Sequence, residues 1–157
     1  MKKGNNLFKL LGSFFMGILS IVIICLFNIF VPKLAPFLFT LIPFSIFFGY
    51  ALLKGKLSKK ILIIMIIISI VYLLVTSLII IPVIDMLEVH IPLTFDNFNL
   101  VYKTKETKDA ILNNALASLV FNIIGNVIVF VIGYGDIKNN NISTNNDNIE
   151  FFDPDLY

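Results

Sequence analysis

Residues Ile61–Ile84 read ILIIMIIISIVYLLVTSLIIIPVI and contain no charged side chain. Eighteen of these twenty-four residues are Ile, Leu or Val. A helix needs about 20 consecutive apolar residues to cross a bilayer, whereas a surface helix of a water-soluble protein keeps one polar face. Inserting such a run into a membrane gains on the order of 5–10 kcal/mol, at a few tenths of a kcal/mol per residue. We therefore predict that it forms a transmembrane helix.

Three more stretches of the chain are of comparable length and also free of charge: residues 10–31, 34–53 and 110–135. With 58% hydrophobic and 14% charged residues, the 157-residue chain is far from the composition of a soluble domain. The predicted fold is an all-α membrane protein with four transmembrane helices in an up-down bundle over residues 10–135. A short N-terminal segment, residues 1–9, precedes the bundle, and a flexible tail, residues 136–157, follows it.

The lysines predict which way the chain crosses the membrane. Eight of the twelve fall before the first span, between the second and third spans, or after the fourth. Short loops on the cytoplasmic side of a membrane carry an excess of basic residues. We therefore expect both termini in the cytoplasm, residues 85–109 outside, and the chain in the plasma membrane as a multi-pass protein.

Residues 87–96 of the outer loop alternate between apolar and polar side chains. A period of two is typical of a strand, and Asp96-Asn97 would turn the chain into a second short strand at residues 98–102. An isolated hairpin is barely stable in water, so it has to rest on the bundle, as a plain connector, or on a partner. For the second case the candidate partner-binding residues are Glu88, His90, Phe95, Phe98 and Tyr102.

Small and polar side chains recur at helical spacing inside the first and fourth spans. They are Ser13, Gly17, Ser20 and Asn28 in the first, and Ser118, Asn122, Gly125 and Asn126 in the fourth. Small residues let transmembrane helices approach closely, and Asn side chains hydrogen-bond across the contact. We therefore predict that these two spans face each other, or face a partner. The eight residues are either helix-packing contacts or the lining of a substrate path. Pro43 is expected to kink the second span, with Thr40 and Ser45 near the freed backbone groups.

The sequence lacks the motifs of an enzyme. No phosphate-binding glycine loop, nucleophile elbow or His-Glu zinc pair occurs. Glu88 and His90 would share one strand face, but one His with scattered carboxylates is a weak metal signal. We therefore expect no catalytic residue, cofactor or metal, and no small-molecule substrate can be identified. The net charge of +2 is too small to indicate nucleic acid.

Two functional hypotheses remain. The first is a non-enzymatic accessory subunit or immunity-type protein that lies in the lipid bilayer and contacts another membrane protein through the outer loop. The alternative is a transporter or pore formed by self-association, with Asn122 and Asn126 along the path.

Overall fold

The computed structural model describes residues 6–146, and the side chains of residues 8–138. Within that range the chain is helical and holds no strand, which confirms the predicted all-α class. The elements are α1 (Asn6–Phe30), the 3₁₀ turn η1 (Pro32–Leu34), α2 (Ala35–Leu38), α3 (Leu41–Leu52), α4 (Lys59–Val75), the π-helical segment η2 (Thr76–Ile80), α5 (Ile81–Glu88), α6 (Phe95–Lys103) and α7 (Lys105–Asn146).

Three described helices are long and apolar enough to cross a membrane. They are Phe8–Phe30 of α1, the continuous rod Lys59–Glu88 made by α4, η2 and α5, and Lys105–Lys138 of α7. The short helices α2 and α3 meet at a bend of 45° and become a fourth candidate if the pair is one broken span. The structure therefore supports a multi-pass membrane protein of three or four spans.

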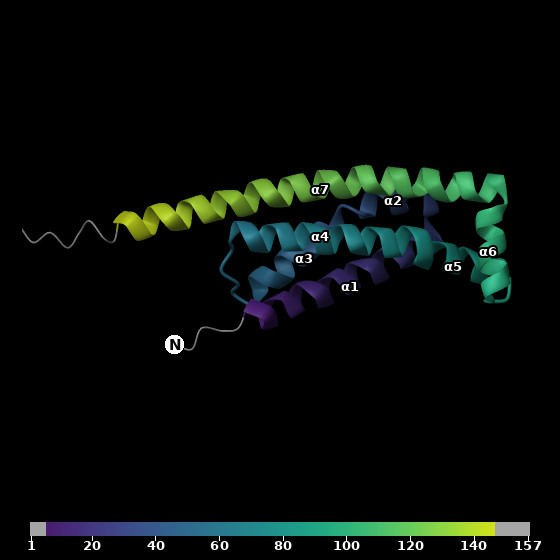
Figure 1. The fold of residues 1–157 in the computed structure, drawn as a ribbon, viewed down its shortest axis with the longest axis horizontal. Coiled ribbons are helices and arrows are strands. Elements are labelled where there is room, and N and C mark those ends of the chain that lie inside the picture. Colours follow the sequence, from purple (N-terminus) through teal and green to yellow (C-terminus); the bar gives the residue numbers. More distant parts are fainter. Residues whose placement is uncertain (1–5, 147–157) are drawn as a thin grey trace, which may run out of the picture.

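Figure 1 shows the long helices side by side, with α6 lying across one end of the assembly between α5 and α7. Helix α1 packs mainly on α3 and also on α4, and α7 packs on α2, α3 and α4. The apolar core draws on α1, α3, α4, α5 and Phe39 between α2 and α3, and side chains of α2 and α7 pack against it. Its best-buried members include Ile24, Phe39, Ile42, Ile46, Tyr50, Leu62 and Leu73.

Of the two alternatives for the stripes on the first and fourth spans, that the two spans face each other is wrong, whereas a contact with a partner stays a prediction. Within residues 6–146, no α1–α7 interface exists on the scale of those with α3 and α4. The small residues of the two helices receive other neighbours: a side chain on Gly17 would meet the ring of Tyr72 on α4, and one on Gly125 would meet Pro43 and Thr40. Helical spacing identified the inward faces of the two spans, but it could not identify the helix that each face meets.

Helices α1 and α3 touch backbone to backbone at Gly12 and Gly49. A Cβ atom added to Gly12 would lie 2.7 Å from the carbonyl oxygen of Gly49 and 2.6 Å from a methyl carbon of Leu53. Such distances are closer than van der Waals contact permits, so both positions require glycine. This crossing accounts for the extensive α1–α3 interface.

The predicted hairpin between the third and fourth spans is also wrong, because helix replaces strand on both sides of Pro92. Helix α5 continues to Glu88 and ends with His90 at a φ of 55°, where the Ile91 amide donates to the Met86 carbonyl at 2.9 Å. A left-handed residue at this position is a common helix stop. Thr94 then caps α6 by accepting a hydrogen bond from the Asn97 amide at 3.2 Å.

The alternating pattern misled because residues 87–96 span the end of one helix and the start of another. The spacing Phe95, Phe98, Tyr102 is helical, and it places the rings of Phe98 and Tyr102 5.2 Å apart on one face of α6. Packing on α7 and the hydrogen bond from Tyr102 to Leu78 of η2 make this short helix possible, because an isolated helix of nine residues is marginal in water.

The fourth span is longer at both ends than predicted. Helix α7 begins at Lys105 instead of residue 110 and continues to Asn146 instead of ending near residue 135. Residues 136–146, expected to belong to a flexible tail, are therefore helical, and residues 147–157 lie outside the described part of the chain, as do Lys2 and Lys3.

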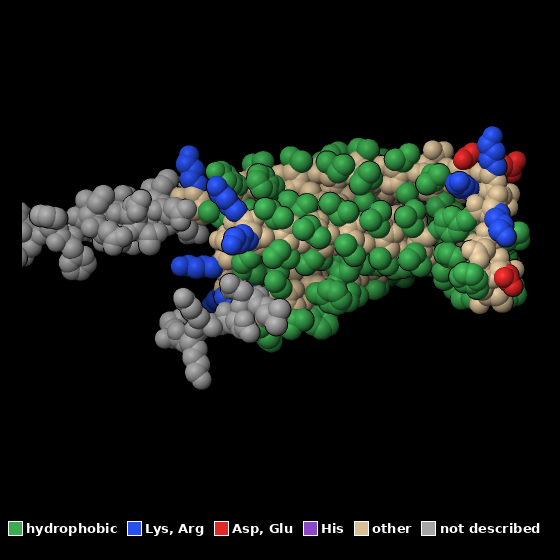
Figure 2. Space-filling view, viewed as in Figure 1, with side chains coloured by type: hydrophobic (Ala, Val, Ile, Leu, Met, Phe, Trp, Pro, Cys, Tyr) green, Lys and Arg blue, Asp and Glu red, His purple; other side chains and the backbone are tan. Residues whose placement is uncertain are grey.

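Charged side chains occupy the two ends of the molecule and leave the middle apolar, as Figure 2 shows. Exposed lysines gather at the end where α3 joins α4. Lysines and carboxylates mix at the opposite end, beside α6. An apolar middle between two charged ends is the arrangement expected of a membrane-spanning bundle.

Candidate functional site

A cluster of polar side chains lies buried between α4 and α7. Ser69 and Asn122 are fully buried and Asn126 is 8% exposed. The Asn122 amide nitrogen donates to Ser69 Oγ at 3.1 Å, and the Asn126 amide nitrogen donates to Asn122 Oδ1 at 2.8 Å. Asn122 lies seventeen residues from Lys105 and sixteen from Lys138, so the cluster is near the middle of the spanning part of α7.

Pro43 explains why Asn122 also reaches the second apolar stretch. A proline has no N–H, so the carbonyl four residues earlier, that of Phe39, loses its helical partner. Phe39 keeps one long hydrogen bond from the Ile42 amide, at 3.4 Å. The Asn122 amide nitrogen supplies a second at 3.3 Å. The amide therefore stabilises the 45° bend between α2 and α3 from the opposite helix.

Gly125 permits this contact by letting α7 approach the bend. A Cβ atom there would lie 2.6 Å from the ring of Pro43 and 2.9 Å from the Thr40 carbonyl oxygen. The kink predicted at Pro43 is present, but the freed backbone carbonyl is paired by a different side chain from the predicted Thr40 or Ser45. The Thr40 hydroxyl donates to Phe37, at 2.8 Å, so the Phe39 carbonyl depends on Asn122.

A second proline site, which sequence reasoning missed, follows the same pattern. Pro82 lies four residues after Leu78, and the Tyr102 hydroxyl of α6 donates to the Leu78 carbonyl. Burial raises the pKa of Tyr102, so the hydroxyl stays protonated as a donor. Just before this point, in η2, the Ser77 hydroxyl donates to the Leu73 carbonyl at 2.8 Å. The available signal was the proline itself, read together with the carbonyl at i−4.

The predicted packing residues of α1 lie inside the bundle. Ser13, Gly17 and Ser20 are buried, and Asn28 is half-buried. The Tyr72 hydroxyl, seated on Gly17, donates to the Phe14 carbonyl at 3.0 Å. At the end of α1 the Asn28 amide donates to Asp85 at 3.3 Å, which joins α1 to α5.

All four predicted packing residues of α7, namely Ser118, Asn122, Gly125 and Asn126, are buried. Among the described side chains, two buried hydroxyls have no hydrogen-bond partner, those of Ser13 and Thr76.

The five predicted contact residues between the third and fourth spans differ in exposure. Glu88, His90 and Phe95 are exposed, whereas Phe98 and Tyr102 are partly buried against the bundle. Within residues 6–146, no group of three or more His, Cys, Asp or Glu side chains is placed to hold a metal ion, so Glu88 and His90 are not part of such a cluster.

The chemistry of the buried cluster is that of neutral hydrogen bonding. Amide and hydroxyl groups pair with one another and with freed carbonyls, and the cluster holds no group that titrates near neutral pH. Such an arrangement holds helices together and relays no proton unaided.

Comparison with protein-family models, with curated proteins and with solved structures finds no match to this chain.

Proposed function

We propose that this chain is a four-span protein of the plasma membrane that works as a non-enzymatic accessory subunit or immunity-type protein. In this proposal α2 and α3 form one broken span, and both termini are cytoplasmic. Two hydrogen bonds support the four crossings. Lys9 donates to the Lys54 carbonyl at 2.9 Å, so the start of α1 meets the end of α3, while Asn28 meets Asp85 at the opposite end.

The carrying observation is a set of apolar side chains at the outer end that the described chain leaves uncovered. We call it the outer apolar patch; its members are Val89, Leu93, Phe95 and Leu100. Phe95 is 80% exposed and Val89 66%. The charged residues Glu88, Asp96 and Lys103 lie near them in the sequence and are exposed. Apolar anchors inside a polar rim are the usual anatomy of a protein interface.

The use of the intramembrane polar groups supports the same proposal. Asn122, Asn126 and Ser69 bond to one another and to a backbone carbonyl, which leaves little free polar surface for a substrate. The side chains best placed to bind a partner are therefore those at the outer end, on α6 and on the segment before it.

Photo-crosslinking in native membranes tests the partner. A crosslinking phenylalanine analogue at position 95 should capture one other membrane protein in a defined ratio. The same analogue at position 15, which is 66% exposed on the apolar side of α1, should capture lipid alone. Recovery of lipid from both positions would contradict the proposal.

A variant pair completes the test. Phe95→Ser with Leu100→Ser should abolish co-purification of the captured protein, because both side chains are exposed, while the partly buried Phe98 and Tyr102 of α6 are left unchanged. Lys105→Ser with Glu106→Ser, at the same end, should leave co-purification intact. Equal loss in both pairs would mean that the outer apolar patch has no special role.

One observation favours a transporter or pore as the second candidate. The broken helix pair α2–α3 contacts Asn122 near the middle of α7, beside Asn126, and transporters build midplane sites from interrupted helices. Asn122→Leu with Asn126→Leu should then stop potassium flux in proteoliposomes while the protein still accumulates in the membrane. Failure to accumulate would identify the asparagines as packing contacts.

A further inference from the structure

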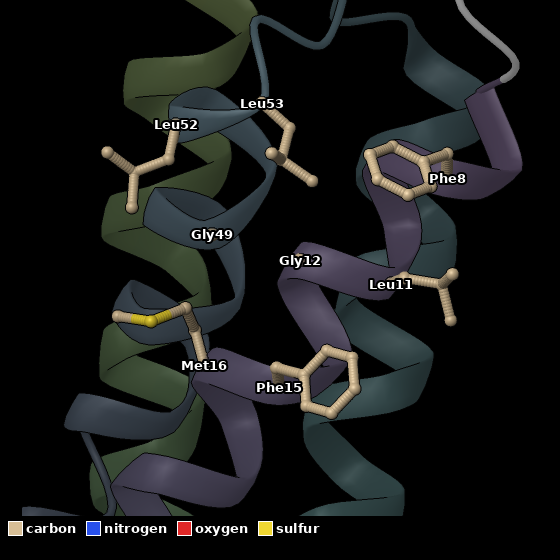
Figure 3. Close-up of a pocket in the computed structure, with 8 residues that line it drawn as sticks. All are labelled: Phe8, Leu11, Gly12, Phe15, Met16, Gly49, Leu52 and Leu53. Atoms are coloured by element: carbon tan, nitrogen blue, oxygen red, sulfur yellow. The ribbon is translucent and has the colours of Figure 1, made fainter.

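An apolar groove runs along the contact of α1 and α3 near the end of the molecule that carries the exposed lysines. It has a volume of about 350 Å³ and is lined by Phe8, Leu11, Gly12, Phe15, Met16, Gly49, Leu52 and Leu53. Figure 3 shows the side chains of Leu11 and Phe15 on one wall and those of Leu52 and Leu53 on the other. Volumes of roughly 300–1,000 Å³ are typical of small-ligand sites.

The two glycines make the groove. Where α1 and α3 cross, Gly12 and Gly49 bring the two backbones into contact, and the larger side chains on either side form the walls of an open groove. Every lining residue is apolar. The groove therefore suits a hydrocarbon chain and offers no hydrogen bond to a polar ligand.

A positive charge lies beside one end of the groove. Lys9 follows the lining residue Phe8, and Lys54 follows the lining residue Leu53. The Lys9 ammonium donates to the Lys54 carbonyl at 2.9 Å, so it is held between the two walls. A lysine ammonium has three N–H donors, so two remain for an anion beside the groove. The exposed Lys54 side chain adds a second cation there.

We propose that the α1/α3 groove binds an anionic phospholipid. One acyl chain lies along Leu11, Phe15 and Leu52, and the headgroup phosphate sits at Lys9 and Lys54. The pairing of an all-apolar groove with a fixed ammonium at its mouth matches the two halves of such a lipid. A transmembrane helix from a partner would fill the apolar part but would leave the lysines without a counter-charge.

Native mass spectrometry of the full-length, delipidated protein tests the site. Phosphatidylglycerol should bind more tightly than phosphatidylcholine with the same acyl chains, with one copy preferred. Lys9→Gln with Lys54→Gln should weaken phosphatidylglycerol binding by about five- to thirtyfold, because each lysine near an anionic headgroup contributes about fivefold. Phosphatidylcholine binding should change by less than about twofold.

The matched control removes the same charge at the same end. Lys59→Gln with Lys60→Gln should leave the preferred copy bound, since these lysines belong to α4, and Lys59 lies over the ring of Tyr134 on α7. Equal weakening by both pairs would reduce the effect to general charge attraction and would overturn the site. Equal binding of the two lipids by the unaltered protein would do the same.

A second pair tests the groove itself. Leu52→Trp, which places a larger side chain in the groove, should displace the preferred lipid, whereas Val22→Trp, on an exposed part of α1 away from the groove, should not. Soluble glycerol phosphate should not compete, because it lacks the acyl chain. Competition by glycerol phosphate, or unchanged binding after Leu52→Trp, would show that the groove does not hold the lipid.

Discussion

Asn122 and Tyr102 perform the same task at two places: each pairs with a carbonyl that a proline has deprived of its helical donor. Asn122 serves the Phe39 carbonyl four residues before Pro43, and Tyr102 serves the Leu78 carbonyl four residues before Pro82. In an apolar medium an unpaired backbone group is destabilising by several kcal/mol. Both prolines are therefore tolerated because a side chain from a later helix is within reach.

Replacing Asn122 tests the value of the buried cluster. Asn122→Leu should lower the free energy of unfolding by about 1–3 kcal/mol, because the Phe39 carbonyl and the Asn126 amide lose partners in a buried site. Reversible unfolding in mixed micelles measures the change. Asn114→Leu, at an exposed position of the same helix, serves as the control and should change stability by less than about 0.5 kcal/mol. Equal effects of the two variants would show that the cluster contributes nothing specific.

A double-mutant cycle tests the second proline site. Tyr102→Phe keeps the ring contact with Phe98 and removes only the hydroxyl, so it should lower stability by about 1 kcal/mol. In a Pro82→Ala background the restored backbone N–H takes over part of this task, and Tyr102→Phe should have a smaller effect. If the effect of Tyr102→Phe is the same in both backgrounds, the hydroxyl does not compensate for Pro82.

At the scale of whole helices, glycine decides where the bundle is tightest. Helix α1 crosses α3 at Gly12 and Gly49, accepts Tyr72 of α4 at Gly17, and thereby packs against two neighbours along one face. Its opposite face carries large exposed apolar residues such as Leu19 and Val22, as expected toward lipid. The close approach of α1 to α3 and α4 therefore depends more on its glycines, which carry no side chain, than on attraction between side chains.

A pair of alanine substitutions separates packing from helix propensity. Gly12→Ala should lower stability by about 1–3 kcal/mol, because the added Cβ would overlap the Gly49 carbonyl and force α1 and α3 apart. Gly135→Ala is the opposite case: no atom lies within 4 Å of the added Cβ. It should be neutral or stabilising by up to about 1 kcal/mol, since alanine favours helix. Thermal unfolding in one detergent compares the two, and a loss at Gly135 equal to that at Gly12 would contradict this account.

The sequence predicts the buried faces well and their neighbours poorly, for a physical reason. Small and polar residues at helical spacing avoid lipid, and the seven buried stripe residues from Ser13 to Asn126 illustrate this. Which helix meets which face depends on large side chains of one helix fitting against small residues of another, as Tyr72 does on Gly17. The periodicity of the sequence carries no such information. The prediction of strands at residues 87–102 was wrong because the ten-residue alternation runs across the end of α5 at His90.

On the scale of the molecule, the distribution of charge over the two ends carries the proposed orientation. The end with Lys9, Lys54, Lys56 and Lys60 is basic, whereas the end with α6 combines lysines with carboxylates. Basic segments remain in the cytoplasm during insertion. The hydrogen bond of Lys9 to Lys54 joins the start of α1 to the basic end, and that of Asn28 to Asp85 joins the other end of α1 to α5.

Cysteine labelling of intact cells tests this orientation. In a Cys25→Ser background, cysteine introduced by Asp96→Cys should react with an impermeant maleimide, because the position is exposed at the outer end. Cysteine introduced by Lys56→Cys or Lys138→Cys should react only after permeabilisation. Labelling of position 56 in intact cells would show that α2 and α3 do not return the chain to the cytoplasm.

The two proline sites also bear on the order in which the protein is made. A ribosome delivers the spans from the N-terminus, and earlier segments begin to fold before later ones exist. The Phe39 carbonyl of the second apolar stretch has to wait for Asn122 in the last one, and the Leu78 carbonyl has to wait for Tyr102. A nascent chain that stops before α7 therefore keeps exposed polar backbone inside the lipid, a feature by which membrane quality control can distinguish an unfinished chain from a completed one.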